Sequence, residues 1–216
     1  IKTPLTSIVN YVDLLKKEEM PSDSAREYLE VLDRQSQRLR KLTEDLVEAS
    51  KASTGNIPVS LAPTDLNVLL SQVCGEYQQR LEKQVLEPVL SLGQPSPWAM
   101  ADGRLLWRVL DNLMSNICKY AMPGTRVYFE SSANAGIVTI TFKNISKYEL
   151  NIPAEELMAR FVRGDRSRHT EGSGLGLSIA QSLTELQGGS FRLEIDGDLF
   201  KAIVSFPQDG TQELHA

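Results

Sequence analysis

The spacing of apolar residues over the first fifty positions is the sequence feature that most restricts the possible folds of this chain. A repeat of four and three begins at once, at Ile1, Leu5, Ile8, Val12 and Leu15. After a break at 20–22 the same spacing returns at Tyr28, Leu32, Gln35, Leu39, Leu42, Leu46 and Ala49. This heptad pattern predicts two consecutive helices that share one apolar seam. Two such helices bury little alone, so we expect a second copy to complete a four-helix bundle; the alternative is a hairpin that packs on the downstream domain.

From residue 57 the pattern changes to mixed helix and strand. We expect helices at 66–83, at 103–120 and from the glycine-rich run to about 186. Strands are expected at 57–61, 85–92, 98–101, 126–131, 137–144, 191–195 and 200–206, and an irregular polar stretch at 145–171. Antiparallel strand pairs with interspersed helices predict a two-layer α/β sandwich, with the helices on one face of the sheet, so the fold class is α+β.

Composition and charge exclude several function classes. No apolar run approaches the roughly 20 residues that span a bilayer, so we expect any membrane contact to come from upstream segments. The net charge of −5 argues against nucleic acid as a partner, because phosphate neutralisation requires clustered Lys and Arg. The two cysteines, Cys74 and Cys118, lie far apart without metal-type spacing, which favours a reducing cytosol.

Three alternate glycines mark a candidate phosphate site. The run Gly172-Ser173-Gly174-Leu175-Gly176-Leu177 leads directly into an apolar segment with helical spacing. Glycine allows close backbone approach and positive φ, and the N-terminus of a helix attracts anions. Tight turns and close helix packing also use such glycines, so this motif alone leaves both interpretations open.

A second candidate element is the polar face of the helix expected at 103–120. Asn112 and Asn116 lie one turn apart, with Lys119 and Tyr120 about a turn further on. A carboxamide oxygen suits Mg²⁺ beside phosphate oxygens, and a lysine offsets phosphate charge. By itself this face is more typical of a solvated amphipathic helix.

In this order, the features resemble the cytoplasmic core of bacterial sensor histidine kinases of two-component systems. The matching parts are Thr3-Pro4 in the hairpin, the Asn-x-x-x-Asn-x-x-Lys-Tyr helix, a basic loop containing Phe161, and the glycine run. The resemblance implies a dimerisation and phosphotransfer hairpin at 1–55, a linker or strand at 56–61, a Bergerat-type ATP-binding domain at 62–208 and a tail at 209–216. It implies ATP and Mg²⁺ as cofactors, a homodimer through 1–55, a response regulator receiver domain as partner, and a cytoplasmic location in a membrane-anchored sensor.

The resemblance also implies a role for each matching residue. Asn116 corresponds to the Mg²⁺ ligand, and Asn112 and Lys119 to its phosphate-side neighbours. Tyr120 and Phe161 line the nucleotide pocket and its lid, and Arg163 reaches the γ-phosphate. The backbone that wraps the phosphates is that of Gly172, Gly174, Leu175, Gly176 and Leu177.

The chain departs from the family pattern at two places. The phosphoaccepting histidine falls two positions before Ile1, and His169 and His215 lie in the wrong elements to replace it. Thr3 matches a position that orients water for dephosphorylating the response regulator. The first glycine box has neither glycine, and Asn144 occupies the position of the aspartate that accepts the adenine amino group. A neutral acceptor weakens that hydrogen bond by about 1 kcal/mol.

Three functions therefore stay open at this point. The first is an ATP-dependent histidine kinase core. The second is a nucleotide-poor module that acts on a response regulator as a phosphatase through Thr3, or as a scaffold. The third, a relative of type II topoisomerases or heat-shock chaperone ATPases, is disfavoured by the heptad hairpin and the Thr-Pro start.

Overall fold

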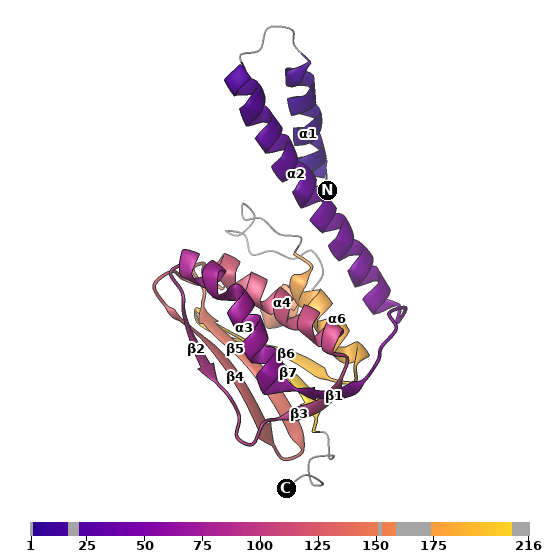
Figure 1. The fold of residues 1–216 in the computed structure, drawn as a ribbon, viewed down its shortest axis with the longest axis vertical. Helices are drawn as coiled ribbons and strands as arrows, with labels where there is room; N and C mark the ends of the chain where they lie inside the picture. Colours follow the sequence, from indigo (N-terminus) through magenta and orange to yellow (C-terminus); the bar gives the residue numbers. More distant parts are fainter. Residues whose placement is uncertain (1, 17–21, 151–152, 159–173, 209–216) are drawn as a thin grey trace. The chain divides into compact units, whose positions relative to one another are not determined.

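The computed structural model describes residues 2–16, 22–150, 153–158 and 174–208. These form two compact units (Figure 1). We call the described residues up to Glu48 the hairpin unit and those from Ala49 onward the sheet unit. Each unit is described by itself.

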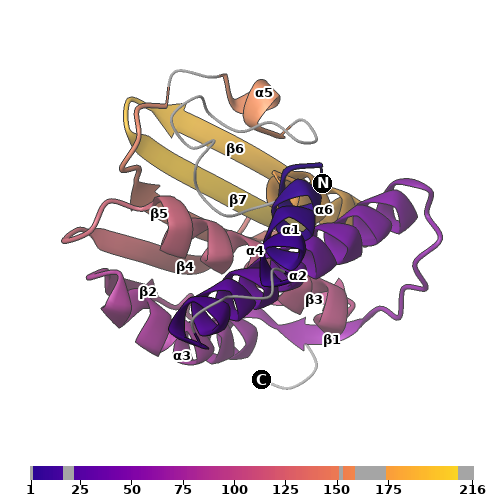
Figure 2. The ribbon, with the colours of Figure 1, turned by 90° about the horizontal axis from the view of Figure 1, so that it is seen from above.

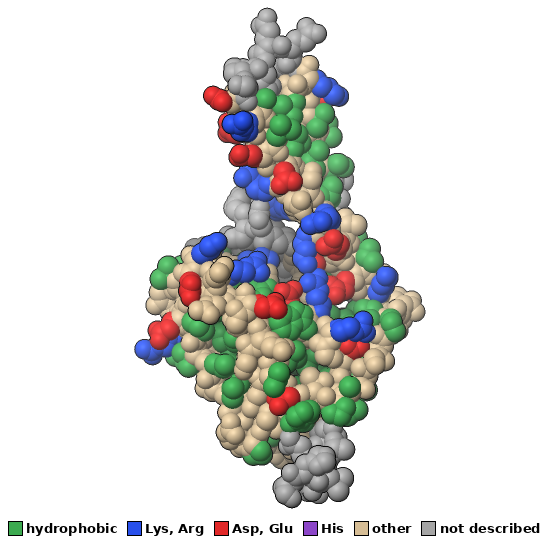
Figure 3. All heavy atoms as spheres, viewed as in Figure 1, with side chains coloured by type: hydrophobic (Ala, Val, Ile, Leu, Met, Phe, Trp, Pro, Cys, Tyr) green, Lys and Arg blue, Asp and Glu red, His purple; other side chains and the backbone are tan. Residues whose placement is uncertain are grey.

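The hairpin unit consists of α1 (Lys2–Leu15) and most of α2 (Ser22–Ser53). The Tyr11 and Tyr28 rings meet edge to face across the pair, with centroids 5.2 Å apart. Ile8, Val12 and Leu32 of the heptad pattern are half-buried, whereas Leu5 is 50% exposed. Val9 and Leu29 are likewise 50% and 57% exposed, and hydrophobic side chains are visible on the surface of the hairpin in Figure 3.

The sheet unit is built on five strands in the order β2-β4-β5-β7-β6. The strands are β2 (Glu87–Ser91), β4 (Arg126–Asn134), β5 (Ile137–Ile145), β6 (Ser190–Asp196) and β7 (Leu199–Pro207). Among the strand pairs that the structure describes in this sheet, only β2–β4 is parallel. A separate antiparallel pair joins β1 (Ala62–Asp65) to β3 (Trp98–Ala101).

Three helices cover one face of this sheet: α3 (Leu66–Lys83), α4 (Gly103–Tyr120) and α6 (Gly176–Leu186) (Figure 2). Alternate residues of β5, namely Val138, Ile140, Phe142 and Asn144, are buried, as the period of two requires. A short helix, α5 (Ala154–Met158), lies in the stretch expected to be irregular. No helix in the described ranges is long and apolar enough to cross a membrane.

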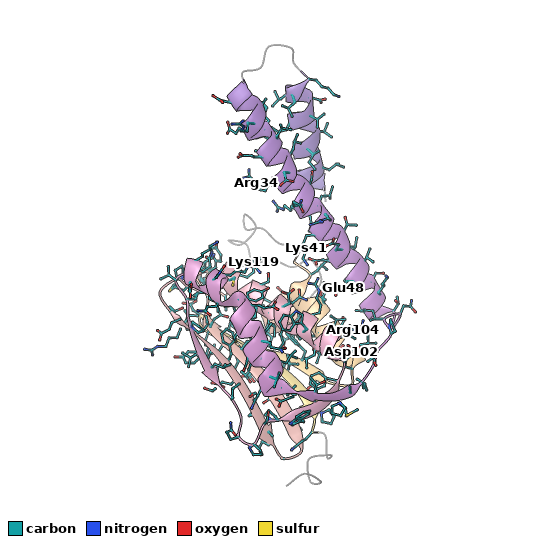
Figure 4. All side chains as sticks on the ribbon, viewed as in Figure 1. Arg34, Lys41, Glu48, Asp102, Arg104 and Lys119 are labelled. Carbon is teal, nitrogen blue, oxygen red and sulfur yellow. The ribbon has the colours of Figure 1, made fainter. Side chains whose placement is uncertain are left out.

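Asp102 anchors the start of α4 and ties distant segments to it. Its buried carboxylate accepts hydrogen bonds from the backbone N–H groups of Ser60 (3.0 Å) and Arg104 (3.0 Å), and from the Arg104 guanidinium (2.9 Å) (Figure 4). Its own N–H donates to Gln187 Oε1 at 2.9 Å, at the end of α6. Burial acts to raise the pKa of this carboxyl, but the hydrogen bonds together outweigh burial and lower it.

The helices expected at 66–83 and 103–120 are confirmed at both ends, and the expected strand pair at 126–144 is present. The strand expected at 57–61 was wrong, since this segment contains no strand and β1 begins at Ala62. Pro58 has no N–H to donate, and the N–H of Ser60 bonds to Asp102 rather than to a neighbouring strand. The turn between β4 and β5 consists of Ala135 and Gly136, both with positive φ.

Candidate functional site

The asparagine face of α4 and the glycine run meet where α4 packs on α6. A methyl group built on Gly176 would lie 3.3 Å from Asn112 Oδ1, closer than most side chains approach. Glycine at 176 therefore leaves room for the asparagine oxygen. Two motifs that are 64 positions apart in the sequence thus share one site.

The Asn112 side chain has a defined orientation. Its Nδ2 donates to the Arg108 carbonyl one turn earlier, at 2.9 Å. Because the amide nitrogen is engaged by the helix itself, the oxygen is the atom next to Gly176. Asn116 and Lys119 follow on the same helix, and both are half-buried; Figure 4 shows Lys119 near the far end of α4 from Asp102.

The start of α6 has the properties of an anion site. Gly174 has φ +71°, a conformation that favours glycine. The next residue, Leu175, is buried, with 1% of its surface exposed. Leu177 is half-buried. No side chain caps this helix within the described residues, so its first N–H groups lack a side-chain acceptor. Such uncapped N–H groups suit a phosphate oxygen.

Asn144 lies at the end of β5 on the face that the helices cover. It is 3% exposed and stands between Val127 and Phe200 of the adjacent strands. Its Nδ2 donates to the carbonyl of Ile145 at 3.2 Å, and among the described residues its Oδ1 accepts no hydrogen bond. The carboxamide oxygen of this largely buried residue is thus available to a donor on a ligand.

Ser146 forms the turn at the position where the family pattern has the first glycine of the first glycine box. The Ser146 hydroxyl donates to the Tyr148 carbonyl at 2.7 Å and accepts from the Tyr148 N–H at 3.2 Å. The Ser146 N–H donates to the Asp198 carbonyl at 2.8 Å, and the Lys147 N–H to the Tyr120 carbonyl at 2.9 Å. Tyr120 therefore contacts this turn through its backbone. The sequence reasoning missed Ser146, although a serine hydroxyl that bonds two residues ahead is a known turn signal.

A second missed feature holds α3 against α4. The buried Tyr77 hydroxyl donates to Asp111 Oδ1 at 2.6 Å, and Arg108 Nη1 donates to Asp111 Oδ2 at 2.9 Å. Burial, followed by the neighbouring Asp111 carboxylate, raises the pKa of Tyr77. This cluster fixes Arg108, whose carbonyl in turn holds Asn112.

Several predicted site residues lie outside the described residues: Phe161, Arg163, Gly172 and the side chain of Thr3. The two thiols, Cys74 and Cys118, are free and half-buried. Burial raises the pKa of Cys74 to about 11, so this thiol is not a reactive thiolate at neutral pH.

Comparison with known protein families identifies the family to which the two parts of the chain belong. The family described as "Histidine kinase-, DNA gyrase B-, and HSP90-like ATPase" matches residues 101–212, and the "His Kinase A (phospho-acceptor) domain" matches residues 1–55. The chain belongs to the sensor histidine kinases. The presence of both family domains, in this order, confirms the family that the sequence resembled.

Sequence relatives of this histidine kinase include two enterococcal sensors. Sensor protein VanSC of Enterococcus gallinarum is 33% identical over 201 residues, covering 90% of this chain and 54% of the relative. Sensor protein VanS of Enterococcus faecium is 29% identical over 213 residues, covering 96% of this chain and 54% of VanS. The chain thus spans about half the length of these relatives.

Solved structures of histidine kinases share the α+β fold. Acinetobacter baumannii histidine kinase AdeS has a TM-score of 0.74 at 17% identity, covering 97% of each chain. Histidine kinase ThkA, in a complex with response regulator protein TrrA, has a TM-score of 0.72 at 19% identity, covering 96% of this chain and 58% of ThkA. At these identities the likeness confirms the fold alone.

Proposed function

We propose that this chain binds Mg–ATP and transfers the γ-phosphoryl group to a histidine two positions before Ile1, and from there to a response regulator. The observation that carries the proposal is the 3.3 Å approach of Asn112 Oδ1 to the Cβ position of Gly176. It brings a polar helix face to an uncapped helix start, the two elements that a magnesium–triphosphate group requires. The family assignment supports the same chemistry.

Each residue has a distinct task in this proposal. Asn116 would supply a carboxamide oxygen to Mg²⁺, and the ion would offset the negative charge of the phosphates. Asn112 and Lys119 bind on the phosphate side, and the N–H groups around Gly174, Leu175, Gly176 and Leu177 cradle the phosphates. Asn144 Oδ1 accepts the adenine amino group, and Tyr120 lines the pocket. Phe161, Arg163 and Gly172 complete the lid and the glycine loop.

The protein accelerates transfer by positioning and by charge stabilisation, since phosphoryl transfer asks little covalent chemistry of it. The hydrogen bond from Asn112 to the Arg108 carbonyl fixes one such group before the nucleotide arrives. The Tyr77, Asp111 and Arg108 cluster holds that part of α4 in place.

The partners follow from the same proposal. The half-exposed Leu5, Val9 and Leu29 form the surface through which residues 1–55 pair with a second copy. The receiver domain of a response regulator is the second partner, and the ThkA–TrrA complex supports this assignment by analogy. Upstream segments anchor the sensor in a membrane and leave this region in the cytoplasm, and nucleic acid is not a partner.

Calorimetric titration with Mg²⁺ and a non-hydrolysable ATP analogue tests the nucleotide site. We expect saturable binding that Asn116→Ala weakens at least tenfold. Asn144→Ala, which removes one neutral hydrogen bond, weakens it about fivefold. Asn134→Ala, at the exposed end of β4, is the matched control and leaves the affinity unchanged. Failure of the unmodified chain to bind would contradict the proposal.

Phosphotransfer is tested on a longer version of the chain that includes the upstream histidine. Radiolabelled ATP should label this histidine, and replacement of the histidine by glutamine should abolish the label. Binding of nucleotide without any labelling would contradict the kinase assignment while leaving the ATP site intact.

One observation favours a second function, a response regulator phosphatase or scaffold. Ser146 and Tyr148 close the turn that two glycines form elsewhere in the family, and this change affects the adenine side of the site. In this case Thr3 orients the attacking water. Loss of receiver dephosphorylation in Thr3→Ala, in a chain that binds no nucleotide, would support this function over the first.

A further inference from the structure

A surface groove runs between α3 and α4 on the sheet unit. It is shallow and open to solvent, has a volume of about 620 Å³, and is lined by Ser71, Gln72, Gly75, Glu76 and Trp107. We call it the α3–α4 groove. Trp107 lies five positions before Asn112 on α4, which places it about 140° around the helix from the asparagine face. The groove is therefore distinct from the nucleotide site and does not depend on the function proposed for that site.

Gly75 leaves open space beside the helix backbone in the groove. It lies in the interior of the 18-residue helix α3, where glycine is the least favourable residue after proline. Its φ is not positive, and a methyl group built on it would meet no atom within 4 Å. The packing of the described residues thus does not explain why residue 75 is a glycine. A partner that approaches the helix backbone closely would explain it, because glycine has no side chain to block that approach.

The charge and chemistry of the lining indicate what that partner presents. Glu76 is exposed, and within the described part of the chain its carboxylate forms no ion pair or side-chain hydrogen bond. Trp107 is half-buried against the core, and its indole N–H has no acceptor among the same residues. A carboxylate and an indole ring in the same groove suit a guanidinium or ammonium group. Such a cation pairs with the carboxylate and lies on the face of the indole ring.

We propose that the α3–α4 groove binds a segment of another protein through a lysine or arginine side chain. The cation pairs with Glu76 and lies on Trp107, while the open space at Gly75 admits the backbone of the segment. Ser71 and Gln72 supply the donors and acceptors that a peptide backbone requires. An ordinary hydrophobic partner would leave the Glu76 carboxylate desolvated and unpaired, which is unfavourable.

The groove adjoins the contact that holds the two helices together. Gly75 and Glu76 immediately precede Tyr77, and Trp107 lies one turn before Asp111. The Tyr77 hydroxyl bonds to Asp111 at 2.6 Å. A bound segment therefore lies next to the helix segments that carry this contact, so we expect occupancy of the groove to be detectable at the Asp111 amide as well as at Trp107.

Titration of the ¹⁵N-labelled chain with the peptide acetyl-Gly-Arg-Gly-amide, followed by NMR, tests the proposal. We expect saturable shifts of the Trp107 indole N–H and of the Gly75, Glu76 and Asp111 amides, with millimolar affinity. Acetyl-Gly-Gln-Gly-amide, which lacks the cation, should not saturate over the same range.

Two variants and one control assign the binding. Glu76→Gln should weaken the arginine peptide at least fivefold. Glu82→Gln should leave its affinity unchanged, since Glu82 lies six positions further along α3 and accepts a hydrogen bond from Gln78. Gly75→Ala should weaken binding threefold or more while raising Tm by about 2–4 °C, because alanine favours the helix. Absence of saturation, equal binding of the glutamine peptide, or an unchanged affinity in Glu76→Gln would each overturn the proposal.

Discussion

The hairpin unit and the sheet unit bury their apolar residues to very different extents. Leu29 of the hairpin unit is 57% exposed and Val9 is 50% exposed, whereas Phe129, Phe142 and Leu110 of the sheet unit are at most 1% exposed. A sheet covered by three helices encloses a core, but two helices enclose only the seam between them. The sheet unit therefore completes its own core, whereas the hairpin unit leaves large apolar side chains exposed, which supports the proposed pairing with a second copy.

The largest effect is expected in the core of the sheet unit. Phe129→Ala removes a ring that packs edge to face on Phe142, with centroids 5.2 Å apart, and should lower the free energy of unfolding by about 4 kcal/mol. Urea unfolding followed by tryptophan fluorescence measures this, since Trp98 and Trp107 both belong to the sheet unit. Ile137→Ala, at a position on β5 that is 50% exposed, is the control and should cost under about 1 kcal/mol.

The next effect concerns the exposed apolar residues of the hairpin unit. Leu29→Asp should raise the dimer dissociation constant at least about thirtyfold, because a leucine buried between copies contributes about 2 kcal/mol. Analytical ultracentrifugation measures the constant. Val68→Asp, at a site of similar exposure (52%) in the sheet unit, is the control and should leave the dimer intact. A monomeric unmodified chain at tens of micromolar would contradict the comparison between the units.

A smaller effect is expected at Asp102, which joins the 57–61 segment to α4 and α6. Asp102→Asn should destabilise the sheet unit by about 2 kcal/mol at pH 7 through weakened capping and loss of the Arg104 pair. The pKa of Asp102 is lowered on folding, so its charge stabilises the fold above the unfolded pKa of about 4, and this contribution is lost as the pH falls further.

The difference between the variant and the unmodified chain should therefore shrink below about pH 4. Denaturant unfolding at several pH values measures this trend. Asp196→Asn, an exposed site at the end of β6, controls for the general effect of removing a carboxylate. A difference that grows as the pH falls would contradict the role given to Asp102.

The smallest effects are expected for the coupling free energies of two ion pairs, one from each unit. Lys143 and Glu130 approach to 2.6 Å on the sheet with side chains 27% and 36% exposed, and their coupling should be about 0.5–1 kcal/mol. Lys16 and Asp13 of the hairpin unit are 3.7 Å apart and 73% and 65% exposed, so solvent screening should leave no measurable coupling. Double-mutant cycles measure both, and equal couplings would contradict this contrast.

Local sequence signals predicted most of the elements but could not predict distant hydrogen bonds. The α3 and α4 helices were predictable at both ends because Asp65 and Asp102 precede clear apolar periodicity and cap the helix starts. The 57–61 segment was misread as a strand because its Ser60 N–H bonds to a carboxylate 42 positions away. Likewise, the Ser146 turn replaces two glycines by a hydroxyl contact that a glycine motif does not describe.

The sequence by itself determined the family, the heptad hairpin, the polar face of α4 and the glycine run, because each is encoded in spacings of a few residues. Tertiary structure alone decided that Asn112 Oδ1 lies against Gly176, that Tyr77 holds Asp111, and that Gly75 faces the groove beside Trp107. Periodicity shows which residues share a helix face. Which faces meet depends on how whole helices pack on the sheet, and that packing is set by long-range burial rather than by neighbouring residues.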